Sequence, residues 1–284
     1  MGRVIYRHFW PAFRPNDFFV NKILSMREGA VSVMGPFENR SMIRDLSNIL
    51  SNKKYDFFIT GENREPEFRR ARKQIGFWRS YKNRSDVFRF PNWMWHLNWP
   101  EIADQPPYPR YGMRLDIDRL MRPIKDTYST QQLDSRQNKA ILFSKHLKEP
   151  RRQLYEVTTS VLGCDGYGGA FNNDNRAQAK MPIMEGYRFS LCPENSIGDG
   201  YITEKIPEAF HSGCIPMAWC RPEDLAEDFN PEAVVNLYGL DDQQRKEILE
   251  EMRRGGQYVQ KLLTTPLLKH KPELKPLIEF INQE

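Results

Sequence analysis

The chain has 284 residues, of which 39% are hydrophobic and 28% charged, and its formal net charge is +5 at pH 7. This length allows one large domain or two of ordinary size, with enough apolar residues to build real cores. The apolar runs are too short to cross a bilayer and the first residues lack a signal-peptide core, so we expect a cytoplasmic protein. The modest positive charge suits an anionic substrate or weak attraction to a membrane surface and is not decisive about nucleic acid, and we expect no nucleic-acid partner.

The four cysteines are Cys164, Cys192, Cys214 and Cys220. They form no CxxC pair, and the five histidines do not add up with them to a convincing zinc site. We therefore expect buried free thiols in a reducing compartment.

The N-terminal half begins with strand patterns at residues 4–6, 31–34 and 55–60 and helical spacing at 20–26 and 41–50. Between the first strand and the first helix lies an aromatic loop containing Pro11 and Pro15. Aromatic rings in such a loop either cover a small core or stack on a sugar. We assign Phe18 to the core and keep Trp10 and Phe13 as candidates on the acceptor side of a binding site.

Glu62 follows the third strand directly, in the turn Gly61-Glu62-Asn63. A carboxylate just past the carboxyl end of a strand is well placed to project into an interdomain cleft. The alternative is a solvated acidic turn. Glu65 and Glu67 are the fallback candidates for the same role.

A strand at 86–90 leads into a segment, residues 91–100, that is dense in tryptophan. Indole N–H groups need partners, so we expect these rings at clefts or interfaces rather than in a closed interior, and we keep Trp95 and His96 as acceptor-side candidates.

Prolines between residues 104 and 110 predict an extended linker, and residues 113–138 a charged crossing with a short helix. Asp116-Ile117-Asp118 lies in that crossing, and we interpret it as a solvated helix face rather than a metal site.

The second half opens with a strand at 139–144, a loop and a helix at 151–161 that begins with Arg151 and Arg152. Such a junction can receive phosphate oxygens, although a solvated basic turn would have the same composition. A glycine-rich turn follows at 164–169 and includes Tyr167.

Residues 187–220 read as a βαβ unit, with strands at 187–192 and 214–219 and a helix from 201 that ends at Ser212-Gly213. Unpaired N–H groups at a helix start suit a phosphate, and ordinary first-turn charges are the alternative reading. The polar residues at this junction are Glu194, Asn195, Ser196, Tyr201, Thr203, Glu204 and Lys205. A last strand at 234–237, a helix at 241–254 and a basic tail follow, and the tail either packs across to the first half or lies on a membrane surface.

Two stretches carry a resemblance to a known family. The stretch YRFSLCPENSIGDGYITEKIPEAFHSGCIPMAWC resembles the donor-binding segment of the family 10 glycosyltransferases, the alpha-1,3/1,4-fucosyltransferases. Pro193 and Cys220 depart from the family pattern, which has an aromatic residue and a glycine there. YDFFITGENREPEF is similar to the family segment whose glutamate is the catalytic base, and that glutamate corresponds to Glu62.

The resemblance implies an α/β fold of GT-B architecture, with two Rossmann-like domains facing across a cleft: residues 1–135 for the acceptor and 136–284 for the donor. It implies inverting transfer of L-fucose from GDP-fucose to a glycan hydroxyl, without a metal or other cofactor. Arg151 would contact the diphosphate, Glu204 the fucose, and Tyr167 and the 194–205 segment would complete the donor pocket. A different nucleotide sugar, or a non-catalytic sugar-binding protein, remains the alternative.

Overall fold

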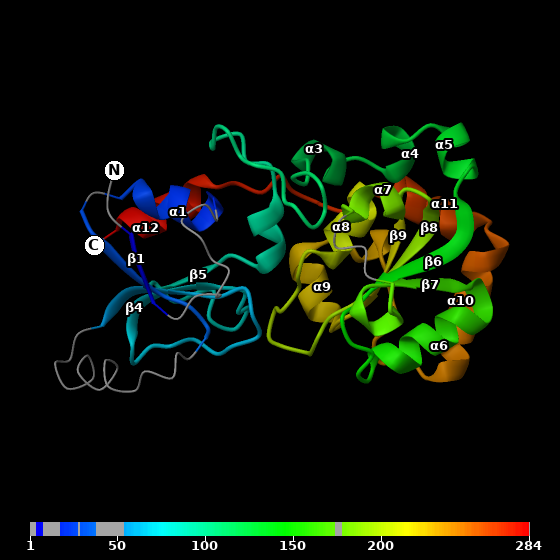
Figure 1. Ribbon diagram of the computed structural model, residues 1–284, viewed down its shortest axis with the longest axis horizontal. Helices are drawn as coiled ribbons and strands as arrows, with labels where there is room; N and C mark the ends of the chain where they lie inside the picture. Colours follow the sequence, from blue (N-terminus) through cyan, green and yellow to red (C-terminus); the bar gives the residue numbers. More distant parts are fainter. Residues whose placement is uncertain (1–3, 8–17, 28, 38–53, 174–177, 284) are drawn as a thin grey trace.

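The computed structural model describes residues 4–7, 18–27, 29–37, 54–173 and 178–283. Two five-stranded sheets, each with all its strands parallel, form two lobes (Figure 1). Both lobes are therefore α/β, and the GT-B architecture expected from the sequence is confirmed. We call the part that contains the sheet of residues 4–89 the first lobe, and the part that contains the sheet of residues 137–236 the second lobe.

The sheet of the first lobe has its strands in chain order, with the first helix between its first two strands. Its elements are β1 (Val4–Arg7), α1 (Phe18–Ser25), β2 (Val31–Met34), β3 (Tyr55–Ile59), β4 (Ala71–Gly76) and β5 (Val87–Arg89). Val33 and Phe57 are fully buried at its centre, as expected for a parallel sheet. The predicted helix at 41–50 lies outside the described residues.

Strand β4 was not predicted, because its sequence ARKQIG contains three polar residues in a row. The structure explains how the strand tolerates them. Gln74 is buried, but its side chain accepts from the backbone N–H of Glu67 and donates to the carbonyl of Ala71. A buried polar group that is fully hydrogen-bonded costs little, so pairing between strands outweighs the local polarity.

The crossing segment between the lobes contains four short helical elements. They are η1 (Asn92–His96), α3 (Ile117–Leu120), α4 (Ile124–Thr127) and α5 (Thr130–Asp134). Asp116 caps α3 by accepting from the backbone N–H of Arg119, and Asp118 is exposed, which agrees with a solvated helix face. The tryptophans depart from expectation: Trp93 and Trp99 are buried, although Trp93 packs on Phe229 of the second lobe at 5.0 Å between ring centroids.

The sheet of the second lobe has the order β10-β9-β8-β6-β7, so the chain first moves outward from β6 to β7 and then returns to the other side of β6. Its elements are β6 (Gln137–Phe143), α6 (Arg151–Leu162), β7 (Cys164–Tyr167), η2 (Gly169–Phe171), α7 (Lys180–Met184), β8 (Tyr187–Pro193), α8 (Lys205–His211), β9 (Ile215–Trp219), α9 (Pro222–Asp228), η3 (Pro231–Ala233) and β10 (Val235–Asn236). This order is that of a flavodoxin-like doubly wound sheet, whose ligands bind where the winding reverses. The reversal lies between β6 and β8.

The glycine-rich turn predicted at 164–169 is in part wrong. Residues 164–167 form the edge strand β7, which pairs in parallel with β6 so that Tyr167 lies beside Phe143. Pairing with a neighbouring strand fixes an extended backbone that glycine and aspartate do not favour by themselves.

The C-terminal segment forms α10 (Asp242–Arg254), α11 (Gln257–Thr264) and α12 (Lys275–Asn282). Helix α12 returns to the first lobe, as Figure 1 shows in red, where Phe280 contacts Phe88 and its carbonyl accepts from Lys73 at 2.9 Å. The tail thus packs across to the first half. The domain boundary at residues 135 and 136 stays a prediction, and α12 belongs spatially to the first lobe.

The four cysteines are buried free thiols, as predicted. Burial raises the pKa of each, to about 12 for Cys192 and Cys214. Within the described parts of the chain, none of the helices is both long enough and apolar enough to cross a membrane.

Candidate active site

The loops that follow β6 and β8 flank the point where the second sheet reverses its winding. Ser144 and Arg151 belong to the first of these connections, and Glu194 to Lys205 to the second. Parallel strands place their carboxyl ends on one edge of the sheet, so these residues meet there. The two stretches that the sequence marked as phosphate-binding therefore lie at the position where this sheet type binds its ligands.

Glu194 organises the second of these loops. Its buried carboxylate accepts from the backbone N–H of Thr203 at 2.8 Å, from the Thr203 hydroxyl, and from the Lys205 ammonium at 2.7 Å. Burial by itself lowers the pKa of Lys205, but Glu194 and Glu204 outweigh burial and raise it. Lys205 is thus held as a cation at the start of α8.

The structure corrects the predicted start of that helix. Residues 201–204 are not helical, and α8 begins at Lys205. Pro207 accounts for the later start, because in a helix from Tyr201 it would lie past the first turn, where it lacks the N–H that the helix needs and its ring collides with the carbonyl four residues before it. Pro207 then falls in the first turn, where the backbone N–H groups have no partner inside the helix, so the proline is tolerated.

Arg151 and Arg152 lie side by side in sequence at the start of α6 but differ in exposure. Arg151 is half-buried, and its guanidinium faces Ser144, with electrostatic contacts to Glu194 and Glu204. Arg152 is 61% exposed and pairs only loosely with Glu149. The guanidinium aimed into the site is that of Arg151, the residue named from the sequence.

Glu204 lies between cations and a histidine from the crossing segment. Its carboxylate is 3.8 Å from the Lys180 ammonium and interacts with Lys205 and His96. Burial alone would raise its pKa, but the ammonium groups of Lys205 and Lys180 outweigh burial and hold the pKa well below its usual range. The His96 ring packs on Tyr108 at 4.2 Å, and burial lowers its pKa to about 4, so at neutral pH it is uncharged.

Glu62 comes from the first lobe and lies near Tyr201 of the second. Burial, Glu194 and Glu62 together raise the pKa of Tyr201. The turn that holds Glu62 is fixed by Thr60, whose hydroxyl accepts from the N–H of Glu62 at 3.0 Å and donates to its carbonyl. The neighbouring Asn63 donates to the Ser196 hydroxyl at 2.8 Å, so the two lobes touch at this point.

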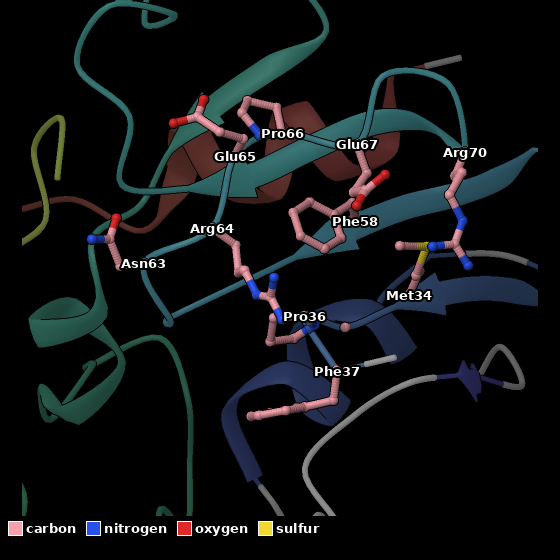
Figure 2. Close-up of a pocket in the computed structure, with 11 residues that line it drawn as sticks. Met34, Pro36, Phe37, Phe58, Asn63, Arg64, Glu65, Pro66, Glu67 and Arg70 are labelled. Atoms are coloured by element: carbon pink, nitrogen blue, oxygen red, sulfur yellow. The ribbon is translucent and has the colours of Figure 1, made fainter. Parts of the chain in front are cut away.

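The first lobe contains a pocket of about 390 Å³ (Figure 2). One of its lining residues is Asn63, which follows Glu62 in the sequence. It lies beyond the carboxyl ends of β2 and β3 and combines aromatic, cationic and acidic side chains. Figure 2 shows Arg64 extending toward Pro36 and Phe37 while Glu65 points away. Its lining residues are Met34, Gly35, Pro36, Phe37, Phe58, Asn63, Arg64, Glu65, Pro66, Glu67 and Arg70. Aromatic faces beside groups that donate and accept hydrogen bonds suit a sugar ring.

The remaining predicted residues lie in varied places. Asn195 and Ser196 are exposed, Tyr167 stacks on Phe143 at 5.4 Å, and the Trp95 carbonyl accepts from Arg114. Trp10 and Phe13 lie outside the described residues. Their roles, like those of the other predicted site residues, stay predictions.

Sequence reasoning missed three residues around Glu204. Glu208 lies one helical turn after it and could have been found from that spacing. Lys180 and Tyr108 come from other segments of the chain, and no local pattern pointed to them. In the described residues no group of three or more His, Cys, Asp or Glu side chains could hold a metal ion.

Part of the chain is similar in sequence to known fucosyltransferases. Residues 133–253 match the family described as "Glycosyltransferase family 10 (fucosyltransferase) C-term". The chain is 37% identical over 89 residues to the alpha-(1,3)-fucosyltransferase FucT of Helicobacter pylori, covering 31% of this chain and 18% of that protein. It is 29% identical over 119 residues to mouse alpha-(1,3)-fucosyltransferase 7, covering 41% of this chain and 31% of that protein. The matches thus span less than a third of these two relatives.

Solved structures extend the fold comparison to nearly the whole chain. A crystal structure of an alpha1,3-fucosyltransferase superposes with a TM-score of 0.71 at 22% identity, covering 98% of this chain and 88% of that one. A structure of an alpha1,3-fucosyltransferase with GDP-fucose gives a TM-score of 0.60 at 21% identity, over 87% of this chain and 88% of that one. Residues 133–253 are thus similar to the C-terminal part of glycosyltransferase family 10, and the fold of these solved fucosyltransferases extends over almost the full length of the chain.

Proposed function

We propose that this protein transfers L-fucose from GDP-fucose to a hydroxyl group of an acceptor glycan, with inversion at the anomeric carbon. The observation that carries the proposal is the convergence of Arg151, Lys205 and Glu204 at the reversal point of the second sheet, with Glu62 of the first lobe near Tyr201 of the same loop. The solved relative with GDP-fucose supports the choice of donor.

On the donor side, the departing diphosphate needs positive charge. Arg151 and Lys205 supply it from two loops, and both are partly withdrawn from water, which strengthens their interaction with a phosphate. Glu194 acts through Thr203 and Lys205, which it holds in place. This cationic set makes a metal unnecessary in the proposed reaction.

On the sugar, positive charge develops at the anomeric carbon as the bond to the diphosphate breaks. Glu204 is ionised and lies near Lys205 and Arg151, so its carboxylate could stabilise that charge. His96 of the crossing segment is neutral and close to Glu204, and its ring nitrogens could bind a sugar hydroxyl.

Inversion requires a base that removes the proton from the attacking hydroxyl on the opposite face of the fucose. Glu62 fits that role because it belongs to the opposite lobe and lies near Tyr201. The pocket described above is our candidate for the acceptor sugar, since it is lined by Asn63, which follows Glu62 in the sequence, and offers Phe37, Phe58 and Arg64. A cytoplasmic location is part of the proposal, supported by the four buried free thiols.

The test is transfer of fucose from GDP-fucose across a glycan array, with the Glu62→Gln variant beside the wild type. We expect this variant to lose about a hundred- to ten-thousandfold in kcat while GDP binding stays within about threefold. Glu251→Gln is the control for loss of a carboxylate, because Glu251 is exposed on α10 and outside the proposed site, and it should keep its activity.

Full activity of Glu62→Gln would remove Glu62 from the role of base. Calorimetric titration with GDP-fucose, GDP-mannose and UDP-sugars tests the donor independently of the acceptor. Tight binding of a UDP-sugar alone would overturn the donor assignment and favour a related transferase. Donor binding without turnover on any acceptor would favour a non-catalytic sugar-binding protein.

A further inference from the structure

Glu208 is a buried carboxylate that the mechanism above does not use. It lies in α8 one turn after Glu204, and only 2% of its surface is exposed. One carboxylate oxygen accepts from the Lys180 ammonium at 2.6 Å. The other oxygen is buried and has no hydrogen-bond partner among the described residues. A half-satisfied buried carboxylate is costly, so its presence calls for a physical reason.

Lys180 connects Glu208 to the site. Its ammonium is 2.6 Å from Glu208 and 3.8 Å from Glu204, so a single cation serves two carboxylates. The backbone N–H of Lys180 donates to the carbonyl of Arg110 at 3.0 Å, and its ammonium lies 5.9 Å from the centre of the Phe143 ring. Lys180 is therefore anchored at its backbone, and the two carboxylates compete for its ammonium.

The charges around Glu208 come from three segments. Lys180 and Arg110 lower its pKa, whereas Glu204, which directly precedes the helix, raises it. Tyr108 also interacts with its charge, and the Tyr111 hydroxyl lies 3.2 Å from its backbone carbonyl. Burial is the largest influence and outweighs the lysine, so the pKa is raised to about 7.

We propose that Glu208 is a positioning residue, which draws the Lys180 ammonium toward itself and so leaves the Glu204 carboxylate free to face the donor sugar. The proposal rests on the proposed function, in which Glu204 stabilises the fucosyl group. Without an ionised Glu208, the Lys180 ammonium moves to Glu204, 3.8 Å away, and neutralises the charge that the reaction requires.

A pH dependence follows from this competition. Below pH 7 Glu208 gains a proton and releases Lys180 to Glu204, whereas above pH 7 it is ionised and holds Lys180. We therefore expect kcat to rise with pH through about 7. The Glu208→Gln variant mimics the protonated state at every pH, so its kcat should be about tenfold lower at pH 8 and show no rise near 7.

The experiment measures kcat and KM for GDP-fucose from pH 5.5 to 9, following GDP release with acceptor and also without it, as donor hydrolysis. Besides wild type and Glu208→Gln it includes Glu208→Asp, which keeps the charge and should keep the rise near pH 7. Glu251→Gln, on an exposed position of α10, is the control for loss of a carboxylate. KM for GDP-fucose should change less than threefold, because the diphosphate contacts are untouched.

A second readout does not depend on activity. The folded-state pKa of Glu208 lies above its ordinary value of 4.5, so its contribution to stability is complete below pH 4.5 and is lost as the pH rises to about 7. The unfolding free energy of the wild type should fall across that window more steeply than that of Glu208→Gln. Equal slopes, or an unchanged kcat profile in Glu208→Gln, would overturn the proposal. Absence of any GDP-fucose turnover in the wild type would instead remove the proposed function, while the stability slopes still decide whether Glu208 titrates as inferred.

Discussion

Arg151 and Arg152 begin the same helix, yet only Arg151 faces the loop of Ser144. A charge-assisted hydrogen bond in a partly desolvated site is worth about 1.5–3 kcal/mol, which corresponds to about ten- to a hundredfold in affinity. We expect Arg151→Ala to weaken GDP binding by that factor, measured by calorimetry. Arg152→Ala should change it less than threefold, because its side chain is 61% exposed. The reverse ranking would reject the alignment of Arg151 with the diphosphate.

Glu194 shows at the same scale how a residue near a ligand site can act through others. All its hydrogen bonds in the described structure go to Thr203 and Lys205, and none of its oxygens needs a ligand to be satisfied. We expect Glu194→Gln to lower the affinity for GDP less than Lys205→Met does, because the amide keeps some of the loop's hydrogen bonds while Lys205→Met removes the charge itself. Calorimetric titration with GDP measures both affinities, and an equal or larger loss in Glu194→Gln would show direct contact with the nucleotide.

At the scale of elements, the loop between β8 and α8 joins the lobes through Gly200. Its φ is +76°, and a Cβ at this position would lie 2.4 Å from the carbonyl oxygen of Phe77 in the first lobe. Gly200→Ala therefore combines backbone strain of about 1–2 kcal/mol with a collision between lobes of about 1–3 kcal/mol. We expect chemical denaturation to show a loss of unfolding free energy equal to the sum of these two terms.

The control for that prediction is Gly239→Ala. Gly239 has the same positive φ, +75°, but nothing lies within 4 Å of the Cβ that alanine would add. It should lose only the strain component, and its kcat should equal that of the wild type. If the two variants lose the same unfolding free energy, the close approach of Gly200 to Phe77 does not contribute to the cost of the alanine.

At the scale of the whole molecule, α9 presents acidic residues to basic residues of the first lobe. Arg89 and Asp228 form a two-bond ion pair at 2.6 and 2.9 Å, with exposures of 13% and 2%. Lys82 and Glu227 form a second pair at 2.7 Å, which is far more exposed. These pairs, together with the packing of α12 on the first sheet, hold the lobes in the arrangement of Figure 1.

The two pairs should differ in their effect on stability. Asp228→Asn removes the carboxylate that is hydrogen-bonded to the buried guanidinium of Arg89, and breaking a buried pair in this way costs about 3–5 kcal/mol of unfolding free energy. Lys82→Gln breaks an exposed pair, which costs about 0–1 kcal/mol. Urea denaturation measures both. A similar small loss in both variants would mean that water reaches the Arg89 pair.

The sequence by itself was sufficient for most of the second lobe and for the residues at its reversal point. Strands such as Tyr187–Pro193 are mostly apolar with little charge, and helices such as Asp242–Arg254 have apolar spacing and a capping box, so local pattern determines them. The loops after those strands contain the polar residues, and the resemblance to family 10 singled out Arg151 and Glu204 among them.

Only the tertiary structure decided what depends on contacts between distant segments. The polar strand Ala71–Gly76 forms because its neighbours pair with it, and the hydrogen bonds of the buried Glu194 carboxylate to Thr203 and Lys205 are seen only in the fold. The Lys180 ammonium shared by Glu204 and Glu208 is likewise invisible in sequence, since it comes from another segment of the chain. Periodicity reports how a residue relates to its chain neighbours, whereas hydrogen bonds and ion pairs form with whichever groups folding brings near.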